Sequence, residues 1–267
     1  MLKKLLKKYP SIWMLTIKIY RWLNPIAKNP LMAIKRYIEF FCDWREYVKL
    51  GGKAKLIDAY PCLFDKIATT PFDAQYFYQA VWASSKINKA QPETHVDVGS
   101  DIKFVGMLSA ICKVEFVDIR PLEVNLPNFV SVDGSILNLP YADGAVQSLS
   151  CMHVIEHIGL GRYGDPLDPD GSRKACAELQ RVLADGGKLY LSVPIGSPRV
   201  QFNGQRILSV SEVFDFLPGL MLVEVGLVDN EGKYHSVIEV DDICFNEAAG
   251  SDFALGCFEF TKDMKSN

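Results

Sequence analysis

The feature that most constrains the fold of this chain is an alternation of strand-like and helix-like segments after residue 90. Five short apolar runs have the composition of buried strands: residues 94–99, 114–118, 128–135, 144–154 and 188–194. Between them, residues 101–112 and 172–187 have apolar side chains at helical spacing. Buried strands that alternate with helices are typical of a mostly parallel sheet with both faces covered. We therefore expect a doubly wound α/β fold.

Two later apolar runs, at residues 220–229 and 253–262, are joined by a polar loop with no helix-like segment. Strands connected in this way are expected to pair antiparallel. We therefore predict an antiparallel hairpin at one edge of the sheet, near the C-terminus. Ahead of these runs, Ser209 and Glu212 have the spacing of a capping box, which predicts the start of a helix.

The N-terminal third differs from the rest in composition. We expect residues 1–90 to form a helical, basic extension or cap, and residues 91–267 to form the sheet domain. Residues 1–38 contain nine basic side chains and no acidic one, whereas the remainder contains 20 basic and 32 acidic side chains. A basic extension suggests contact with an anionic surface, while the acidic body argues against nucleic acid as a substrate.

The apolar run at residues 12–23 is too short to span a bilayer, and basic residues interrupt it. No cleavage site of small residues follows, so we expect no signal peptide. Three aromatic side chains suit a helix that lies in a membrane interface: Trp13, Tyr20 and Trp22. An amphipathic helix packed on its own domain explains the same pattern, and both interpretations stay open.

The seven cysteines are scattered singly, with no C-x-x-C pair. Their number is odd, so they cannot all form disulfides within the chain. This usage is typical of reduced thiols. We expect a cytoplasmic protein, with peripheral contact to the inner face of a membrane if the basic extension binds lipid.

His153, Glu156 and His157 have the H-x-x-E-H order of one class of zinc peptidase. Such a site needs both histidines on a sustained helix and a third ligand from elsewhere. Here a predicted strand precedes the motif, and Gly159 and Gly161 follow it at once. We interpret the motif as a coincidence and expect no metal site.

In open parallel sheets, ligands bind beyond the carboxyl ends of the strands. The residues just past the first four predicted strands are therefore the binding-site candidates: Asp97, Gly99, Ser100, Asp118, Ile119, Arg120, Asp133, Gly134, Ser135, Met152, His153 and His157. The carboxylate of Asp118 suits the two hydroxyls of a ribose, and Asp133 suits an exocyclic amine, with Ser135 beside it. Gly99 would let the backbone approach a ligand closely.

Several motifs together resemble the class I S-adenosylmethionine-dependent methyltransferases, over roughly residues 92–262. The segments VDVGS, VDIRP and VDGSILNLPYADG are similar to the first three motifs of that superfamily, and ELQRVLADGGKLYLSVP is similar to its helix, Gly-Gly turn and fifth strand. The segments HVIEHIGLGRYGDPLDPDG and GCFEFTK resemble, more closely, domain of unknown function family 268. The resemblance implies a Rossmann-like fold, S-adenosyl-L-methionine as the cofactor, and cofactor-binding roles for the residues from Asp97 to His153 named above.

The implied function is methyl transfer to oxygen of a sugar, a glycan or another small polar acceptor, since some relatives are encoded near genes of sugar-polymer synthesis. Two alternatives stay open. The first motif has a single glycine, Gly99, where that superfamily usually has two or three, so the chain could instead be a non-catalytic relative that binds a nucleotide or a partner. The second alternative is a nicotinamide-dependent oxidoreductase, because Asp118 lies about 20 residues after Gly99, which is the spacing found in such enzymes.

The loop at residues 159–171 is long for this fold and lies beside the expected reaction centre. His157 is the best candidate for a general base, because an imidazole changes its charge near neutral pH; a structural role in the turn is the competing interpretation. Asp165 and Asp168 suit the binding of sugar hydroxyls, although each precedes a proline and suits a turn equally. The remaining substrate candidates are Arg162, Tyr163, Tyr76 and Tyr78, whereas we expect Phe77 and Trp82 to lie in the core.

Overall fold

The computed structural model describes residues 9–238 and 251–263, so the lysine-rich start of the basic extension and most of the predicted polar loop lie outside the described residues. The chain divides into two compact units, Met1–Pro71 and Phe72–Asn267. The sequence analysis placed residues 72–90 with the extension. In the structure they belong to the second unit, because their helix packs on the sheet.

The first unit contains helices α2 (Pro10–Lys28) and α3 (Pro30–Lys49) and the short 3-10 helix η1 (Leu56–Asp58). Trp22 of α2 stacks on Tyr37 of α3, with ring centroids 5.6 Å apart. The side chain of Asn29 accepts a hydrogen bond from the backbone N–H of Met32 and so caps α3. Within residues 9–238 and 251–263, no helix is long and apolar enough to cross a membrane.

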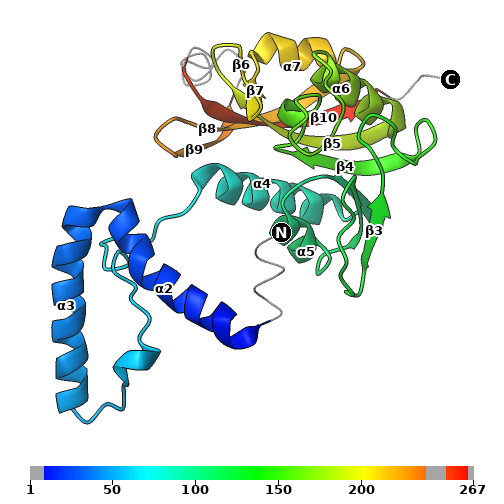
Figure 1. The fold of residues 1–267 in the computed structure, drawn as a ribbon. Helices are drawn as coiled ribbons and strands as arrows, with labels where there is room; N and C mark the ends of the chain where they lie inside the picture. Colours follow the sequence, from blue (N-terminus) through cyan, green and yellow to red (C-terminus); the bar gives the residue numbers. More distant parts are fainter. Residues whose placement is uncertain (1–8, 239–250, 264–267) are drawn as a thin grey trace. The chain divides into compact units, whose positions relative to one another are not determined.

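The second unit contains an eight-stranded sheet (Figure 1). Its strands are β1 (Thr94–Val98), β2 (Lys113–Asp118), β3 (Phe129–Asp133), β4 (Val146–Met152), β5 (Leu183–Ile195), β8 (Leu220–Val228), β9 (Tyr234–Ile238) and β10 (Ala254–Lys262). Their order in the sheet is β3-β2-β1-β4-β5-β10-β8-β9, with β1 to β5 parallel and the last three strands antiparallel. This topology confirms the predicted doubly wound sheet and its antiparallel C-terminal edge.

Helices cover both faces of this sheet (Figure 1). On one face, α4 (Ala74–Ala90) and α5 (Ile102–Leu108) bury Trp82 and Phe104 against the strands. On the other, α6 (Gly171–Val182) and α7 (Val210–Phe216) contribute Leu179 and Val213 to the larger core. The burial of Trp82 was predicted; Phe77, however, is 53% exposed, so its assignment to the core was wrong.

The C-terminal strands differ in detail from the predicted hairpin. β10 lies between β5 and β8, and the edge strand is β9, which the sequence analysis read as loop. The reason is the composition of the two late runs: β10 is buried along Ala254–Phe260, which requires a neighbour on both sides. The predicted capping box is confirmed, since Ser209 and Glu212 exchange hydrogen bonds at the start of α7. A small two-stranded sheet, β6 (Arg199–Gln201) and β7 (Gln205–Ile207), completes the fold.

Candidate functional site

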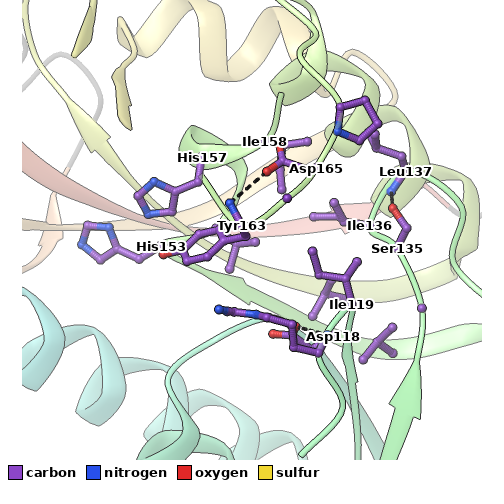
Figure 2. Close-up of a pocket in the computed structure, with 18 residues that line it drawn as sticks. Asp118, Ile119, Ser135, Ile136, Leu137, His153, His157, Ile158, Tyr163 and Asp165 are labelled. Carbon is purple, nitrogen blue, oxygen red and sulfur yellow. Dashed lines mark hydrogen bonds and ion pairs between the residues drawn. The ribbon is translucent and has the colours of Figure 1, made fainter. Parts of the chain in front are cut away.

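A cavity of about 490 Å³ lies at the carboxyl ends of β1 to β4, where ligands bind in sheets of this kind (Figure 2). Most of its walls are apolar, from the strand ends and the loops that follow them: Val98, Val117, Ile119, Ile136, Leu137, Val154, Ile158 and Pro166. A volume of several hundred Å³ with mainly apolar walls and a few polar groups is typical of small-molecule sites.

Asp118, at the end of β2, places a carboxylate in this cavity. Its Oδ1 accepts a hydrogen bond from the backbone N–H of Arg120, at 2.7 Å. Its Oδ2 has no hydrogen-bond partner among the described residues and faces Gly99, where an added Cβ would lie 4.0 Å away. Gly99 has a φ of +70°, and the same Cβ would lie 3.2 Å from Val154. A side chain at position 99 would therefore fill the space next to the free carboxylate oxygen.

A second cavity, of about 410 Å³, adjoins the first. Six residues line both: Gly99, Asp118, Arg120, His153, His157 and Tyr163. The second cavity adds Tyr76 from α4 and the two polar residues that precede α5, Ser100 and Asp101. The two cavities therefore form one bipartite site, apolar on one side and more polar on the other.

A buried hydrogen-bonded chain lies beneath this site. Ser100 and Ser150 both donate their hydroxyl protons to Oδ2 of Asp97, and His95 contacts Ser148 and Ser150 at 2.8 Å through its two ring nitrogens. Burial raises the pKa of Asp97 to about 6, against the lowering effect of these hydroxyls, and burial lowers the pKa of His95 to about 3. Asp97 therefore holds the chain segment below the site and does not line either cavity.

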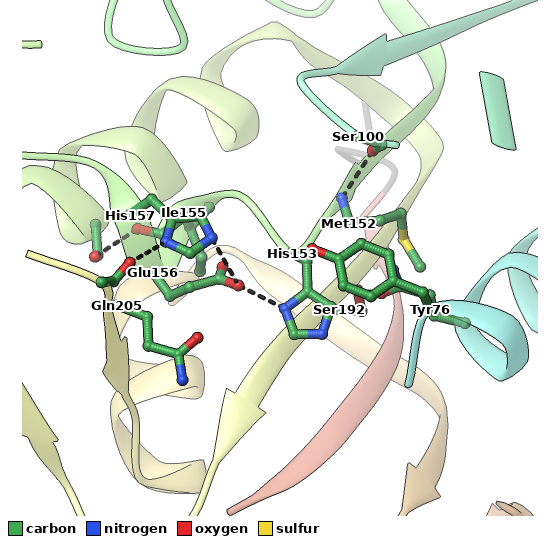
Figure 3. Close-up of polar contacts among 12 residues, drawn as sticks. Tyr76, Ser100, Met152, His153, Ile155, Glu156, His157, Ser192 and Gln205 are labelled. Atoms are coloured by element: carbon green, nitrogen blue, oxygen red, sulfur yellow. Dashed lines mark hydrogen bonds and ion pairs between the residues drawn. The ribbon is translucent and has the colours of Figure 1, made fainter. Parts of the chain in front are cut away.

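The H-x-x-E-H segment follows β4 as a single 3-10 turn, η2 (Ile155–His157), which is too short for the zinc-peptidase geometry. Nδ1 of His153 lies 2.7 Å from Oε1 of the fully buried Glu156 (Figure 3). Nδ1 of His157 lies 2.7 Å from the carbonyl oxygen of Gly204, to which it donates. Within the described part of the chain, no group of three or more metal-ligating side chains is present.

The long loop after η2 is organised by two charged side chains. Asp165 accepts hydrogen bonds from the backbone N–H groups of Gly159, Gly161 and Tyr163. Burial acts to raise the pKa of Asp165, but these backbone donors together lower it below its ordinary value. Arg206, only 8% exposed, donates to the carbonyl oxygens of Ile158, Asp168 and Pro169. The loop is thus fixed as a wall of the first cavity.

The structure brings most of the predicted site residues together. At the first cavity lie Gly99, Asp118, Ile119, Arg120, Gly134, Ser135, His153, His157, Tyr163 and Asp165; the second adds Tyr76, Ser100 and Met152. Five others line neither cavity: Asp97, Asp133, Arg162, Asp168 and Tyr78.

The reasons differ. Asp133 ends β3 with an exposed side chain, Asp168 forms an ion pair with Lys174 at 2.6 Å, and Tyr78 stacks on Tyr234. The guanidinium of Arg162 donates a hydrogen bond to the carbonyl oxygen of Gly204 and does not line the cavities.

Three kinds of functional residue escaped the sequence analysis. Ile136, Leu137 and Ile158 form apolar walls, but nothing in their spacing distinguishes them from core. Arg206 lies 38 residues from Asp168 in the chain, so no local pattern connects it with the loop. Glu156 stands inside the H-x-x-E-H motif, and that motif is the one signal that could have drawn attention to a histidine–carboxylate pair.

The chain matches one protein family. Residues 140–225 fit the family described as Caenorhabditis protein of unknown function, DUF268. Over these residues, the predicted resemblance to this family is confirmed. They run from the loop after β3 through the long wall loop to β8, and so include the H-x-x-E-H segment and Arg206. The chain has no match among curated protein sequences.

Solved structures with similar folds include the [4+2]-cyclase SpnF, with a TM-score of 0.50, 12% identity, and coverage of 92% of this chain and 94% of that chain. The N-methyltransferase NodS from Bradyrhizobium japonicum, in complex with S-adenosylhomocysteine, has a TM-score of 0.48 and 15% identity over 76% of this chain and 92% of that one. The 1,6-didemethyltoxoflavin-N1-methyltransferase of Burkholderia thailandensis has a TM-score of 0.47 and 14% identity, covering 74% and 94%. At these identities the similarity is one of fold alone, and the shared fold is Rossmann-like.

Proposed function

We propose that this protein is an S-adenosyl-L-methionine-dependent methyltransferase. The observation that carries the proposal is the free Oδ2 of Asp118 at the end of β2, facing Gly99 in a cavity with apolar walls. A carboxylate that can accept two hydrogen bonds fits the hydroxyls of a ribose, and the apolar walls fit a purine ring. When bound, the cofactor supplies a methyl group on a positively charged sulfur.

The residues of the site divide between the two ends of such a ligand. Asp118 would hold the ribose, and Ile119, Leu137 and Ile158 would enclose the base. The polar second cavity, with Ser100 and Asp101, would take the amino-acid end, where the single Gly99 leaves less flexible backbone than a glycine-rich motif.

Calorimetric titration of the full chain with S-adenosylmethionine and S-adenosylhomocysteine tests this assignment. Asp118→Ala should abolish micromolar binding, whereas Asp133→Ala is a matched control. It removes the same side chain from the paired register position on β3, outside both cavities. Equal affinities in the two variants would contradict the placement. Binding of neither compound by the intact chain would favour a non-catalytic relative, and binding of NAD⁺ instead would favour an oxidoreductase.

For the acceptor we propose a hydroxyl of a sugar or another small polar molecule. The second cavity supports this class, because the aromatic rings of Tyr76 and Tyr163 lie near the cation of Arg120 and the imidazole of His153. Aromatic faces with nearby hydrogen-bonding groups suit a sugar, which has both C–H faces and hydroxyls. Transfer of a labelled methyl group to a panel of mono- and disaccharides tests the class, and transfer only to amine acceptors would contradict it.

We also propose that the first unit contacts the cytoplasmic face of an anionic membrane. Five apolar side chains of α2, each at least 43% exposed, form one stripe at helical spacing: Ile12, Leu15, Ile19, Leu23 and Ile26. Lys18 flanks this stripe and its positive charge suits anionic headgroups, whereas Arg21 lies on the opposite face of the helix, over the ring of Tyr60.

Cosedimentation with phosphatidylserine-containing vesicles should be lost in a Leu23→Asp variant. Leu31→Asp, on the 83% exposed Leu31 outside the stripe, should bind as the unaltered chain does. Equal binding by both variants, or no binding by the unaltered chain, would contradict the contact.

A further inference from the structure

His153 has an unusual environment for a residue that follows a buried strand. Its φ is +57°, in the left-handed region that non-glycine residues rarely adopt and that is often found at functional sites. The residue is 92% buried, lines both cavities, and its Nε2 has no hydrogen-bond partner in the described part of the chain. A buried polar atom left unpaired costs free energy, on the order of 1–3 kcal/mol. We therefore expect a group of a ligand to form the missing hydrogen bond with Nε2.

The other ring nitrogen determines the chemistry of Nε2. Nδ1 lies 2.7 Å from Oε1 of Glu156, which is 0% exposed. A carboxylate accepts, so Nδ1 carries the proton and Nε2 presents its lone pair. Tyr76 stacks on the imidazole at 5.0 Å, and its pKa is raised, first by burial and then by the negative charge of Glu156 (Figure 3). Glu156 thus fixes the tautomer of His153, while Tyr76 covers the ring.

His157, the base expected from sequence, is placed differently. Its Nδ1 lies 2.7 Å from the carbonyl oxygen of Gly204, and Arg162 reaches the same carbonyl at 3.0 Å. Its Nε2 lies 3.7 Å from Oε1 of Glu156, on the far side of that carboxylate from His153 (Figure 3). His157 therefore ties the turn after β4 to the β6–β7 connection, whereas His153 has a buried carboxylate as the partner of Nδ1 and a buried Nε2 with no partner among the described residues.

We propose that His153 is the catalytic base that takes the proton of a hydroxyl acceptor, and that Glu156 is its positioning residue. This inference rests on the proposed methyltransferase function. The acceptor O–H bond breaks as its proton passes to Nε2, the oxygen's electron pair forms the bond to the methyl group, and the pair of the broken C–S bond stays on sulfur. The resulting imidazolium lies against the Glu156 carboxylate, which stabilises its charge.

The tautomer of His153 is measurable without any acceptor. The chain has only four histidines, so two-bond ¹H–¹⁵N spectra of the histidine-labelled full chain can be assigned with single His→Gln variants. We expect His153 to be protonated on Nδ1. His235 is a matched internal reference with the opposite geometry, because its Nε2 contacts Asp229 at 2.8 Å and should carry the proton.

Glu156→Gln should shift both ring nitrogens of His153 and leave those of His235 in place, while Asp229→Asn should do the reverse. A His153 protonated on Nε2, or one whose signals do not respond to Glu156→Gln, would overturn the assignment. Calorimetry with S-adenosylhomocysteine on the same unaltered sample separates the two proposals. If the chain does not bind S-adenosylhomocysteine, the proposed methyltransferase function is wrong. If it binds but His153 is protonated on Nε2, only the assignment of His153 as the base is wrong.

Discussion

The guanidinium carbon of Arg120 lies 4.4 Å from the centroid of the Tyr163 ring. Arg120 follows β2, Tyr163 lies in the loop after η2, and both side chains line both cavities. The contact therefore joins the strand ends to the loop wall directly over the bipartite site. The loop is anchored at its base by Asp165 and Arg206, and the contacts of the Tyr163 ring with Arg120, Arg162 and His157 place its tip at the site.

Tyr163→Ala should weaken binding of S-adenosylhomocysteine about 2- to 5-fold, because an exposed cation–π contact contributes about 0.5–1 kcal/mol. Tyr163→Phe retains the ring and should bind as the unaltered chain does. Tyr60→Ala is a matched control, since Arg21 lies over Tyr60 at 4.0 Å in the first unit. Calorimetry on the three variants measures the effect; unchanged affinity in Tyr163→Ala would show that the contact does not shape the site.

Gly99→Ala should reduce the affinity for S-adenosylhomocysteine by about tenfold or more, since the methyl group enters the space beside Asp118 and meets Val154. The substitution also strains a backbone with φ +70°, by about 1–2 kcal/mol. Gly144→Ala carries the same strain, at φ +67°, but its nearest neighbour is 4.0 Å away and it lines neither cavity. Equal binding by the two variants would assign the effect to strain alone.

Asp97 and His95 should have opposite effects on stability against pH. The raised pKa of Asp97, about 6, means that the folded chain holds a proton that the unfolded chain releases above about pH 4. Its contribution to stability therefore falls as pH rises from about 4 to 6. The lowered pKa of His95, about 3, has the reverse sign: its contribution is lost as pH falls below about 6.5.

Relative to the unaltered chain, Asp97→Asn should therefore lose more stability on acidification, and His95→Gln less. Urea unfolding at pH 4.5 and 6.5 measures the difference, which should approach about 1–3 kcal/mol in each direction. If both substitutions change the pH dependence of the unfolding free energy in the same direction, the Asp97–Ser150–His95 chain titrates as a single unit.

Arg206→Lys should lower the melting temperature and weaken cofactor binding together. A lysine ammonium cannot reach all the carbonyls that Arg206 satisfies, and each carbonyl left buried and unpaired costs about 1–3 kcal/mol. Arg199→Lys is the control, because Arg199 also donates to two carbonyls but is not part of the loop wall. Thermal unfolding with and without S-adenosylhomocysteine gives both readouts. If Arg206→Lys lowers the melting temperature but binds S-adenosylhomocysteine normally, the loop that Arg206 holds does not contribute to cofactor binding.

Comparison of the predicted and observed sites shows how local patterns limit prediction. Asp118 and Asp133 both end a strand and are paired in register, so the sequence treats them alike. Only one of them lines the cavities, because β3 is the edge strand and its terminal side chain is exposed. Asp165 and Asp168 both precede proline, yet Asp165 turns inward to three backbone donors and Asp168 outward to Lys174.

The sequence by itself determined the alternation of strands and helices, the start of α7 at Ser209, and the set of residues that follow each parallel strand. These properties depend on side-chain periodicity and on turns of a few residues, which are local. Only the tertiary structure decided that β10 lies between β5 and β8, that Arg206 holds the loop, and that the carbonyl oxygen of Gly204 fixes the imidazole of His157. Each of these depends on contacts between segments far apart in the chain, whose hydrogen bonds form only once the sheet and its loops are packed.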